Sequence, residues 1–81
     1  MENFMVGIHD WNDQVVEVPM GTLIAWKGAL KLEAAGMKHS RGSVATHVRT
    51  VLSVPDGNMS VSELADYISR TVADINNQLA G

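Results

Sequence analysis

One short segment of this 81-residue chain gathers residue types that could bind an anion. It runs from Gly36 to Ser43 and lies between two apolar patterns with helical spacing, so it should lead into the N-terminus of a helix. Free amides and the helix dipole favour negative charge there, Arg41 could make a forked contact with phosphate or carboxylate, and Gly42 allows close approach to the backbone. The predicted ligand-binding residues are Lys38, His39, Ser40, Arg41, Gly42 and Ser43, helped by Lys31 and Arg49.

The alternative interpretation of this segment is an ordinary turn between two helices. Its glycines would then satisfy backbone geometry, and its basic side chains would simply be solvated. The segment lacks the Gly-x-x-x-x-Gly-Lys-Ser/Thr order of a phosphate-binding loop of the Walker type. Both interpretations therefore stay open.

Charge is segregated along the chain. Residues 27–49 hold five of the six lysines and arginines but only one of the nine acidic residues, Glu33, while the net charge of the whole chain is −3. Charge concentrated in one stretch can act as a local field even when the net charge is small.

The stretch from residue 30 to residue 43 resembles a segment of short, uncharacterised phage and bacterial proteins. In them a Leu-Lys-Leu-Glu helix end runs into Gly-Met-Lys and Ser-Arg-Gly, as it does here. The resemblance covers about a sixth of the chain and implies a small protein of phage type. It implies no activity.

Residues for catalysis or for a metal centre are not arranged convincingly. Ser40 and Ser43 lie near His39, but adjacent residues rarely aim their side chains at one another, and no third group is positioned to help. The chain has no cysteine, and its three histidines show no spacing typical of zinc ligands. We therefore expect no enzyme activity and no cofactor.

Residues 60–75 are similar to the opening of a helix-turn-helix, but the apolar stripe runs through the place where the turn would be. The supposed recognition helix would also present Asp66 and Asp74 with Arg70 as its one arginine, which suits DNA phosphates poorly. A nucleic-acid-binding regulator would need the basic stretches of two subunits on one face.

Aromatic side chains suggest a different kind of contact. Trp26 and His47 lie on apolar helical stripes and are expected to pack in or beside the core. Trp11 lies in a polar turn, where burial does not explain it, so we predict that it binds a partner.

The elements that position these residues belong to one small domain, residues 1–81. Residues 4–8 and 15–18 are predicted to form a hairpin, with Pro19 ending the second strand. Helices should begin near Thr22, after Gly42 and at Ser60, and Gly36 should end the first of them. Ser60 and Glu63 form a capping box before a long amphipathic stripe. The predicted fold is α+β and α-rich, a hairpin followed by three helices.

The predicted function is that of a non-enzymatic accessory protein of phage type, acting by binding. Its basic turn would receive a phosphate-bearing small molecule, such as a nucleotide, or an acidic protein surface, for example on an inhibited host protein. A small core and a long last helix favour a homo-oligomer. Without an apolar run of about 20 residues or a charged leader, we expect no membrane partner and a cytoplasmic location. The alternatives are a nucleic-acid-binding regulator and a purely structural oligomerisation module.

Overall fold

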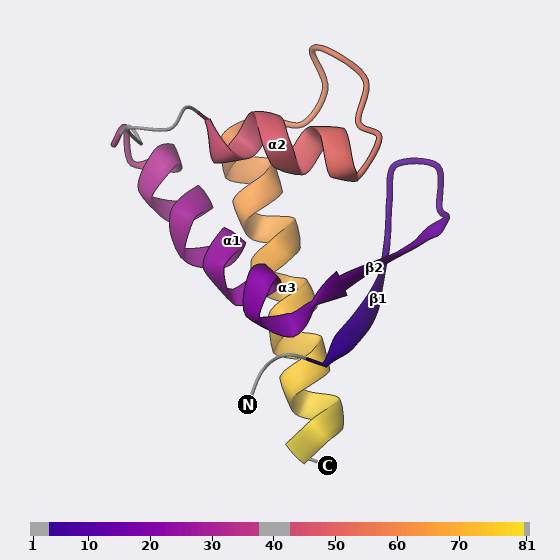
Figure 1. Cartoon of the computed structure of the whole chain (residues 1–81). Helices are drawn as coiled ribbons and strands as arrows, with labels where there is room; N and C mark the ends of the chain where they lie inside the picture. Colours follow the sequence, from indigo (N-terminus) through magenta and orange to yellow (C-terminus); the bar gives the residue numbers. More distant parts are fainter. Residues whose placement is uncertain (1–3, 38–42, 81) are drawn as a thin grey trace.

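A computed structural model of the protein describes residues 4–37 and 43–80. The elements are β1 (Met5–His9), β2 (Val15–Pro19), α1 (Met20–Ala34), α2 (Val44–Val51) and α3 (Val61–Ala80). Helix α1 packs along α3, and α2 crosses them near their upper ends in the view of Figure 1. The hairpin formed by β1 and β2 lies to the right of α1 and α3 in the same view. The predicted hairpin followed by three helices, the last one long, is confirmed.

Strands β1 and β2 pair in antiparallel register, with Val6 opposite Val18 and Ile8 opposite Val16. These side chains face the helices, whereas the alternate positions face outward and are exposed. The turn between the strands is stabilised by Asp10, whose Oδ1 accepts hydrogen bonds from two backbone amides, those of residues 12 and 14, at 2.9 Å each. Polar turn residues therefore fix the hairpin, as the sequence predicted.

The first helix begins earlier than predicted. Thr22 was expected as the N-cap, but the N-cap is Pro19, in extended conformation, and the helix starts at Met20. The amide of Met20 donates to the carbonyl oxygen of Phe4 at 2.9 Å, which joins the helix start to the beginning of β1. Because proline has a fixed φ and lacks an amide hydrogen, it can end the strand and lead directly into the helix.

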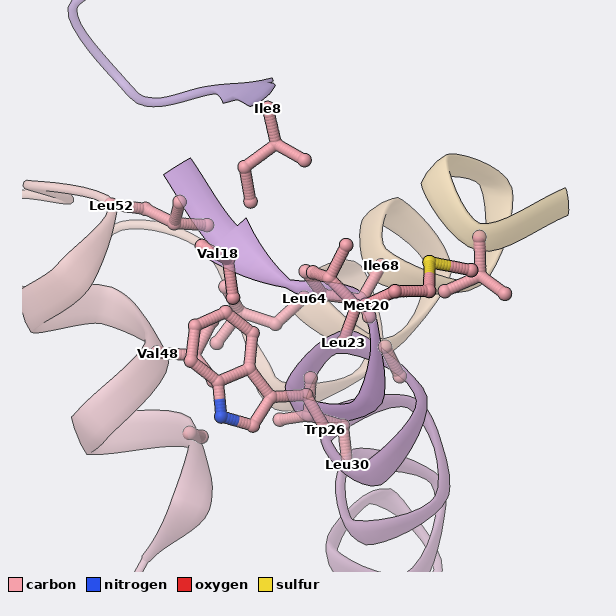
Figure 2. Packing of buried hydrophobic residues seen from close by; sticks show 13 residues of the cluster. Ile8, Val18, Met20, Leu23, Trp26, Leu30, Val48, Leu52, Leu64 and Ile68 are labelled. Carbon is pink, nitrogen blue, oxygen red and sulfur yellow. The ribbon is translucent and has the colours of Figure 1, made fainter. Parts of the chain in front are cut away.

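One apolar cluster joins all five elements (Figure 2). Trp26 is 7% exposed and belongs to this cluster, as predicted. His47 packs its ring edge-on against Trp26, with 5.9 Å between ring centroids, but its side chain is exposed rather than half-buried. The fully buried large side chains come from α1, α2, the residue after α2 and α3: Met20, Leu23, Leu30, Val48, Leu52, Leu64 and Ile68.

Helix α3 is continuous from Val61 to Ala80, without the turn that a helix-turn-helix requires. The predicted capping box forms: the amide of Ser60 donates to Glu63 Oε1 at 2.8 Å, and the amide of Glu63 donates to Ser60 Oγ at 3.1 Å. The apolar stripe is buried against the rest of the chain as far as Val72, and the last turns project beyond α1 (Figure 1). The stripe thus serves mainly the internal core.

Among the described residues, 4–37 and 43–80, no helix is both long enough and apolar enough to cross a bilayer.

Candidate functional site

Most of the predicted anion-binding turn lies outside the described residues. Lys38, His39, Ser40, Arg41 and Gly42 belong to this group, and their roles stay predictions. The residues that flank them are described. Gly36 has a φ of 91°, its amide donates to the carbonyl of Glu33, and the amide of Met37 donates to the carbonyl of Leu32, each at 3.0 Å. This hydrogen-bond pattern is a Schellman motif, so Gly36 ends the first helix as predicted.

The N-terminus of α2 already holds an anion from the chain itself. The amides of Val44 and Ala45 donate to the two carboxylate oxygens of Glu33, both at 3.0 Å. The amide of Thr46 donates to Ser43 Oγ at 3.2 Å, so Ser43 is the N-cap of the helix. An external anion at these three amides would have to displace Glu33 or the Ser43 hydroxyl.

Lys31 and Arg49 line different hollows and do not come together. Lys31 lines an open hollow of about 450 Å³ between α1 and α3, together with Asp66 and Ser69. The hydroxyl of Ser69 is buried and has no hydrogen-bond partner among residues 4–37 and 43–80. The structure therefore does not assemble Lys31 and Arg49 into one anion site.

Arg49 projects from α2 into a polar pocket of about 540 Å³, which we call the Arg49 pocket. Its Nε donates to the carbonyl oxygen of Met59 at 3.0 Å, and the side chain is half-buried. Within the described residues, neither of the ion pairs involves Arg49. The pocket is lined by Thr46, Arg49, Thr50, Val54, Asp56, Gly57, Asn58, Met59, Ser60 and Glu63.

Trp11 lies beside a smaller, more apolar hollow of about 230 Å³, which we call the Trp11 groove. Trp11 as a whole residue is 48% exposed. Its backbone amide nevertheless donates to the carbonyl oxygen of Leu52 at 2.9 Å. The hairpin turn is thereby fastened to the end of α2. The groove is lined by His9, Asp10, Trp11, Leu52, Val54, Met59 and Tyr67.

Tyr67 fastens the same turn from the side of α3. Its hydroxyl donates to the carbonyl oxygen of His9. Burial raises the pKa of the Tyr67 phenol above its ordinary value, and the negative charges of Asp10 and Asp13 raise it further. A phenol is protonated at neutral pH even at its ordinary pKa, and the upward shift extends to higher pH the range in which the Tyr67 hydroxyl is a hydrogen-bond donor.

The turn at the mouth of the groove is acidic. Asp10 and Asp13 lie on either side of Trp11, and Asp13 pairs with His9 through Oδ1 and Nδ1 at 3.2 Å. The side chain of Asp13 is 91% exposed, so its charge is open to an approaching molecule.

Sequence reasoning proposed Trp11 as a partner-binding residue but did not predict the groove beside it. The other walls come from the end of α2, the following loop and α3, and Tyr67 lies 58 residues from His9 along the chain. No local pattern links these positions, because the turn of the hairpin meets them only after folding. Within residues 4–37 and 43–80, no group of three or more histidine, aspartate or glutamate side chains is suited to a metal ion.

Comparison with protein-family models, with curated proteins and with solved structures finds no match to this chain. The geometry of these sites therefore stands alone as the basis for a proposed function.

Proposed function

We propose that this protein acts by binding a segment of another protein in the Trp11 groove, without catalysing a reaction. One observation carries the proposal: Trp11 is half-exposed, yet its backbone is fixed to α2. A residue whose backbone is already fixed has less conformational entropy to lose when a partner covers its side chain. Such residues are enriched among the positions that contribute most to binding.

The second tryptophan shows why this exposure matters. Trp26 is 7% exposed and contributes to the core, whereas Trp11 leaves about half of its surface open to water. Tyr67, Leu52 and Met59 give the groove apolar walls. Covering this surface with an apolar side chain would remove more apolar area from water, which favours association.

The charges beside the groove restrict the partner further. Asp10 and Asp13 lie one and two positions from Trp11 along the chain, and both carboxylates act electrostatically on Tyr67, which lines the groove. A lysine or arginine of the partner would be attracted to both carboxylates and could also lie over the indole face. We therefore propose a partner segment that carries an apolar side chain with a basic residue next to it.

The earlier hypothesis of an anion site at residues 36–43 has weaker support from the described residues. The amides of Val44 and Ala45 are taken by Glu33, and Lys31 and Arg49 line separate hollows. An acidic partner or a nucleotide at the basic turn, nucleic-acid binding, phage origin and homo-oligomerisation all stay predictions. None of them is needed for a partner to bind at Trp11.

A selection from random displayed peptides tests the proposal. The full wild-type chain is expected to enrich peptides that carry an apolar residue beside a lysine or arginine. Trp11→Ala should weaken their binding by about tenfold or more, as expected for a residue that dominates an interface. Affinities would be measured by titration of synthetic copies of the enriched peptides.

Leu79→Ala is the matched control, because Leu79 is also large, apolar and exposed but lies near the end of α3. This change should leave peptide binding unaltered. Melting curves of both variants would exclude unfolding as the cause of a loss. Enriched peptides that bind Trp11→Ala as well as they bind the wild type would overturn the proposal.

A further inference from the structure

The guanidinium group of Arg49 is oriented, but its charge forms no ion pair with the residues that the structure describes. The Nε bond to the Met59 carbonyl holds the group against the loop that follows α2, and the side chain is half-buried. Its two terminal nitrogens make no hydrogen bond or ion pair within the described residues. A planar edge with two donors remains, and such an edge matches a carboxylate in bidentate geometry.

The remaining lining of the Arg49 pocket favours a singly charged anion over a doubly charged one. Thr46 and Thr50, one helical turn apart, also line it. The hydroxyl of Thr50 already donates to the carbonyl oxygen of Thr46 at 3.0 Å, so Thr46 is the residue whose hydroxyl would serve an anion. The carboxylates of Asp56 and Glu63 line the same pocket, and Glu63 accepts a hydrogen bond from the Ser60 amide. A phosphate dianion would meet stronger repulsion from these two acidic groups than a carboxylate would.

The Arg49 pocket adjoins the Trp11 groove. Val54 and Met59 line both, so the two hollows meet along the loop between α2 and α3. This loop holds unusual backbone conformations: φ is 57° at Ser53, 82° at Gly57 and 55° at Met59. Positive φ at two residues other than glycine is conformationally costly, and such strain is often found where a chain contacts a ligand.

We infer that the Arg49 pocket binds a carboxylate of the same partner segment whose apolar side chain enters the Trp11 groove. This inference rests on the proposed function and adds orientation to it. The basic residue of the segment would face Asp10 and Asp13, and its carboxylate would face Arg49. The protein is negative beside the Trp11 groove and positive in the Arg49 pocket. These opposite charges favour one chain direction of the bound segment and disfavour the reverse direction.

Sodium acetate is the first probe. It would be titrated into the full ¹⁵N-labelled chain at constant ionic strength, with the Arg49 Nε–H signal as the readout. The expected result is a saturable shift of this signal, with acetate binding several-fold more tightly than phosphate. A shift that rises linearly without saturation, or equals that caused by chloride, would overturn the inference.

Three variants make the test specific. Arg49→Gln should abolish saturation, followed here through the backbone amides of residues 46 and 50, whereas Arg70→Gln removes the same charge elsewhere on the molecule and should preserve it. Because Arg49→Gln also removes the donor to Met59, Thr46→Val provides a variant that keeps this contact, and it should weaken acetate binding several-fold. Unchanged acetate binding in Arg49→Gln would overturn the inference.

The second probe is the set of peptides enriched through Trp11. Replacing an internal aspartate or glutamate by its amide, or the terminal carboxylate by a terminal amide, identifies which carboxylate binds. One replacement should weaken wild-type binding by about tenfold and should have little effect on Arg49→Gln. Equal effects on both proteins would overturn the inference.

Different results would overturn the peptide-binding Trp11 groove and the carboxylate-binding Arg49 pocket. Peptides that depend on Trp11, combined with no saturation by acetate, would overturn the carboxylate site and leave the groove intact. Saturation by acetate without any peptide that depends on Trp11 would overturn the proposed function and also the inferred link between the two hollows.

Discussion

Helices α2 and α3 both begin with a carboxylate next to their first amides, but the two carboxylates come from different places. At α3 the group is Glu63, three residues after Ser60 and part of the same helix. At α2 it is Glu33, which lies in α1, 11 and 12 residues before the amides it binds. The start of α3 is therefore a local structure, whereas the start of α2 depends on the packing of α1.

The difference matches what each helix needs. Helix α3 has 20 residues and a long apolar stripe, so its own turns and its packing can maintain it. Helix α2 has eight residues, too few to be stable in isolation. The carboxylate of Glu33 accepts hydrogen bonds from the first amides of α2 and also joins α2 to α1. This contact stabilises a helix that is too short to be stable by itself.

The ends of α1 and α2 offer a second comparison. Both have the bonds of a Schellman motif: after α2, the amide of Ser53 donates to the carbonyl of Thr50 at 3.2 Å, and the amide of Val54 donates to that of Arg49 at 2.9 Å. The left-handed position is occupied by Gly36 after α1 and by Ser53 after α2. The same hydrogen bonds are thus made with a favourable residue in one case and an unfavourable one in the other.

The largest expected effect comes from Glu33→Gln. An amide can accept from only one of the two backbone donors and presents its own N–H groups to the other, and the charge that favours a helix N-terminus is lost. We expect the free energy of unfolding to fall by about 2 kcal/mol, the scale of hydrogen bonds to a charged group. Chemical denaturation would measure this change, and hydrogen exchange at Val44 and Ala45 would localise it.

Glu63→Gln is the matched control for this prediction, since it removes the same charge from the start of the other helix. We expect a smaller loss of stability from it, with exchange at the start of α2 unchanged. Equal stability of the wild type and Glu33→Gln would show that the carboxylate of Glu33 is dispensable for α2.

The next effect concerns the two left-handed positions. Gly36→Ala should destabilise the protein by about 1 kcal/mol, because an added Cβ meets no atom within 4 Å and the cost is that of the backbone alone. Ser53→Gly relieves the corresponding strain and should stabilise by less than about 1 kcal/mol. Denaturant midpoints that move in the same direction for both variants would contradict this explanation.

The smallest effect is the pH dependence at the capping box. The amide of Ser60, and then its hydroxyl, hold the pKa of the Glu63 carboxyl below its ordinary value. A lowered pKa in the folded state means that the contribution to stability is present above the ordinary pKa and is lost as pH falls through the lowered one. Melting temperatures of the wild type and Glu63→Gln should therefore differ at neutral pH and converge in acid.

Asp74→Asn is the control for this titration, because it neutralises an acidic residue of α3 away from the start of the helix. Its difference from the wild type should not follow the same pH course. A constant difference between the wild type and Glu63→Gln down to strongly acidic pH would contradict the role assigned to Glu63.

The same comparison explains which features could be predicted from sequence. The capping box, Gly36 and the strand alternation are patterns within a few residues, and the hairpin with three helices followed from them. Glu33 at α2, and Tyr67 at the hairpin turn, join positions that only tertiary packing brings together. Trp11 was identified because a tryptophan in a polar turn is unusual, but its groove needed walls from three other parts of the chain.

The two tryptophans also make this protein a spectroscopic reporter of its own states. The emission of Trp26, shielded from water, should shift to the red when the chain unfolds, whereas the half-exposed Trp11 should already emit at long wavelength and be accessible to acrylamide. Single replacements by phenylalanine would separate the two signals. Quenching of Trp11 in the Trp26→Phe variant would then follow occupancy of its groove, and the emission of Trp26 in the Trp11→Phe variant would follow folding, both without an added label.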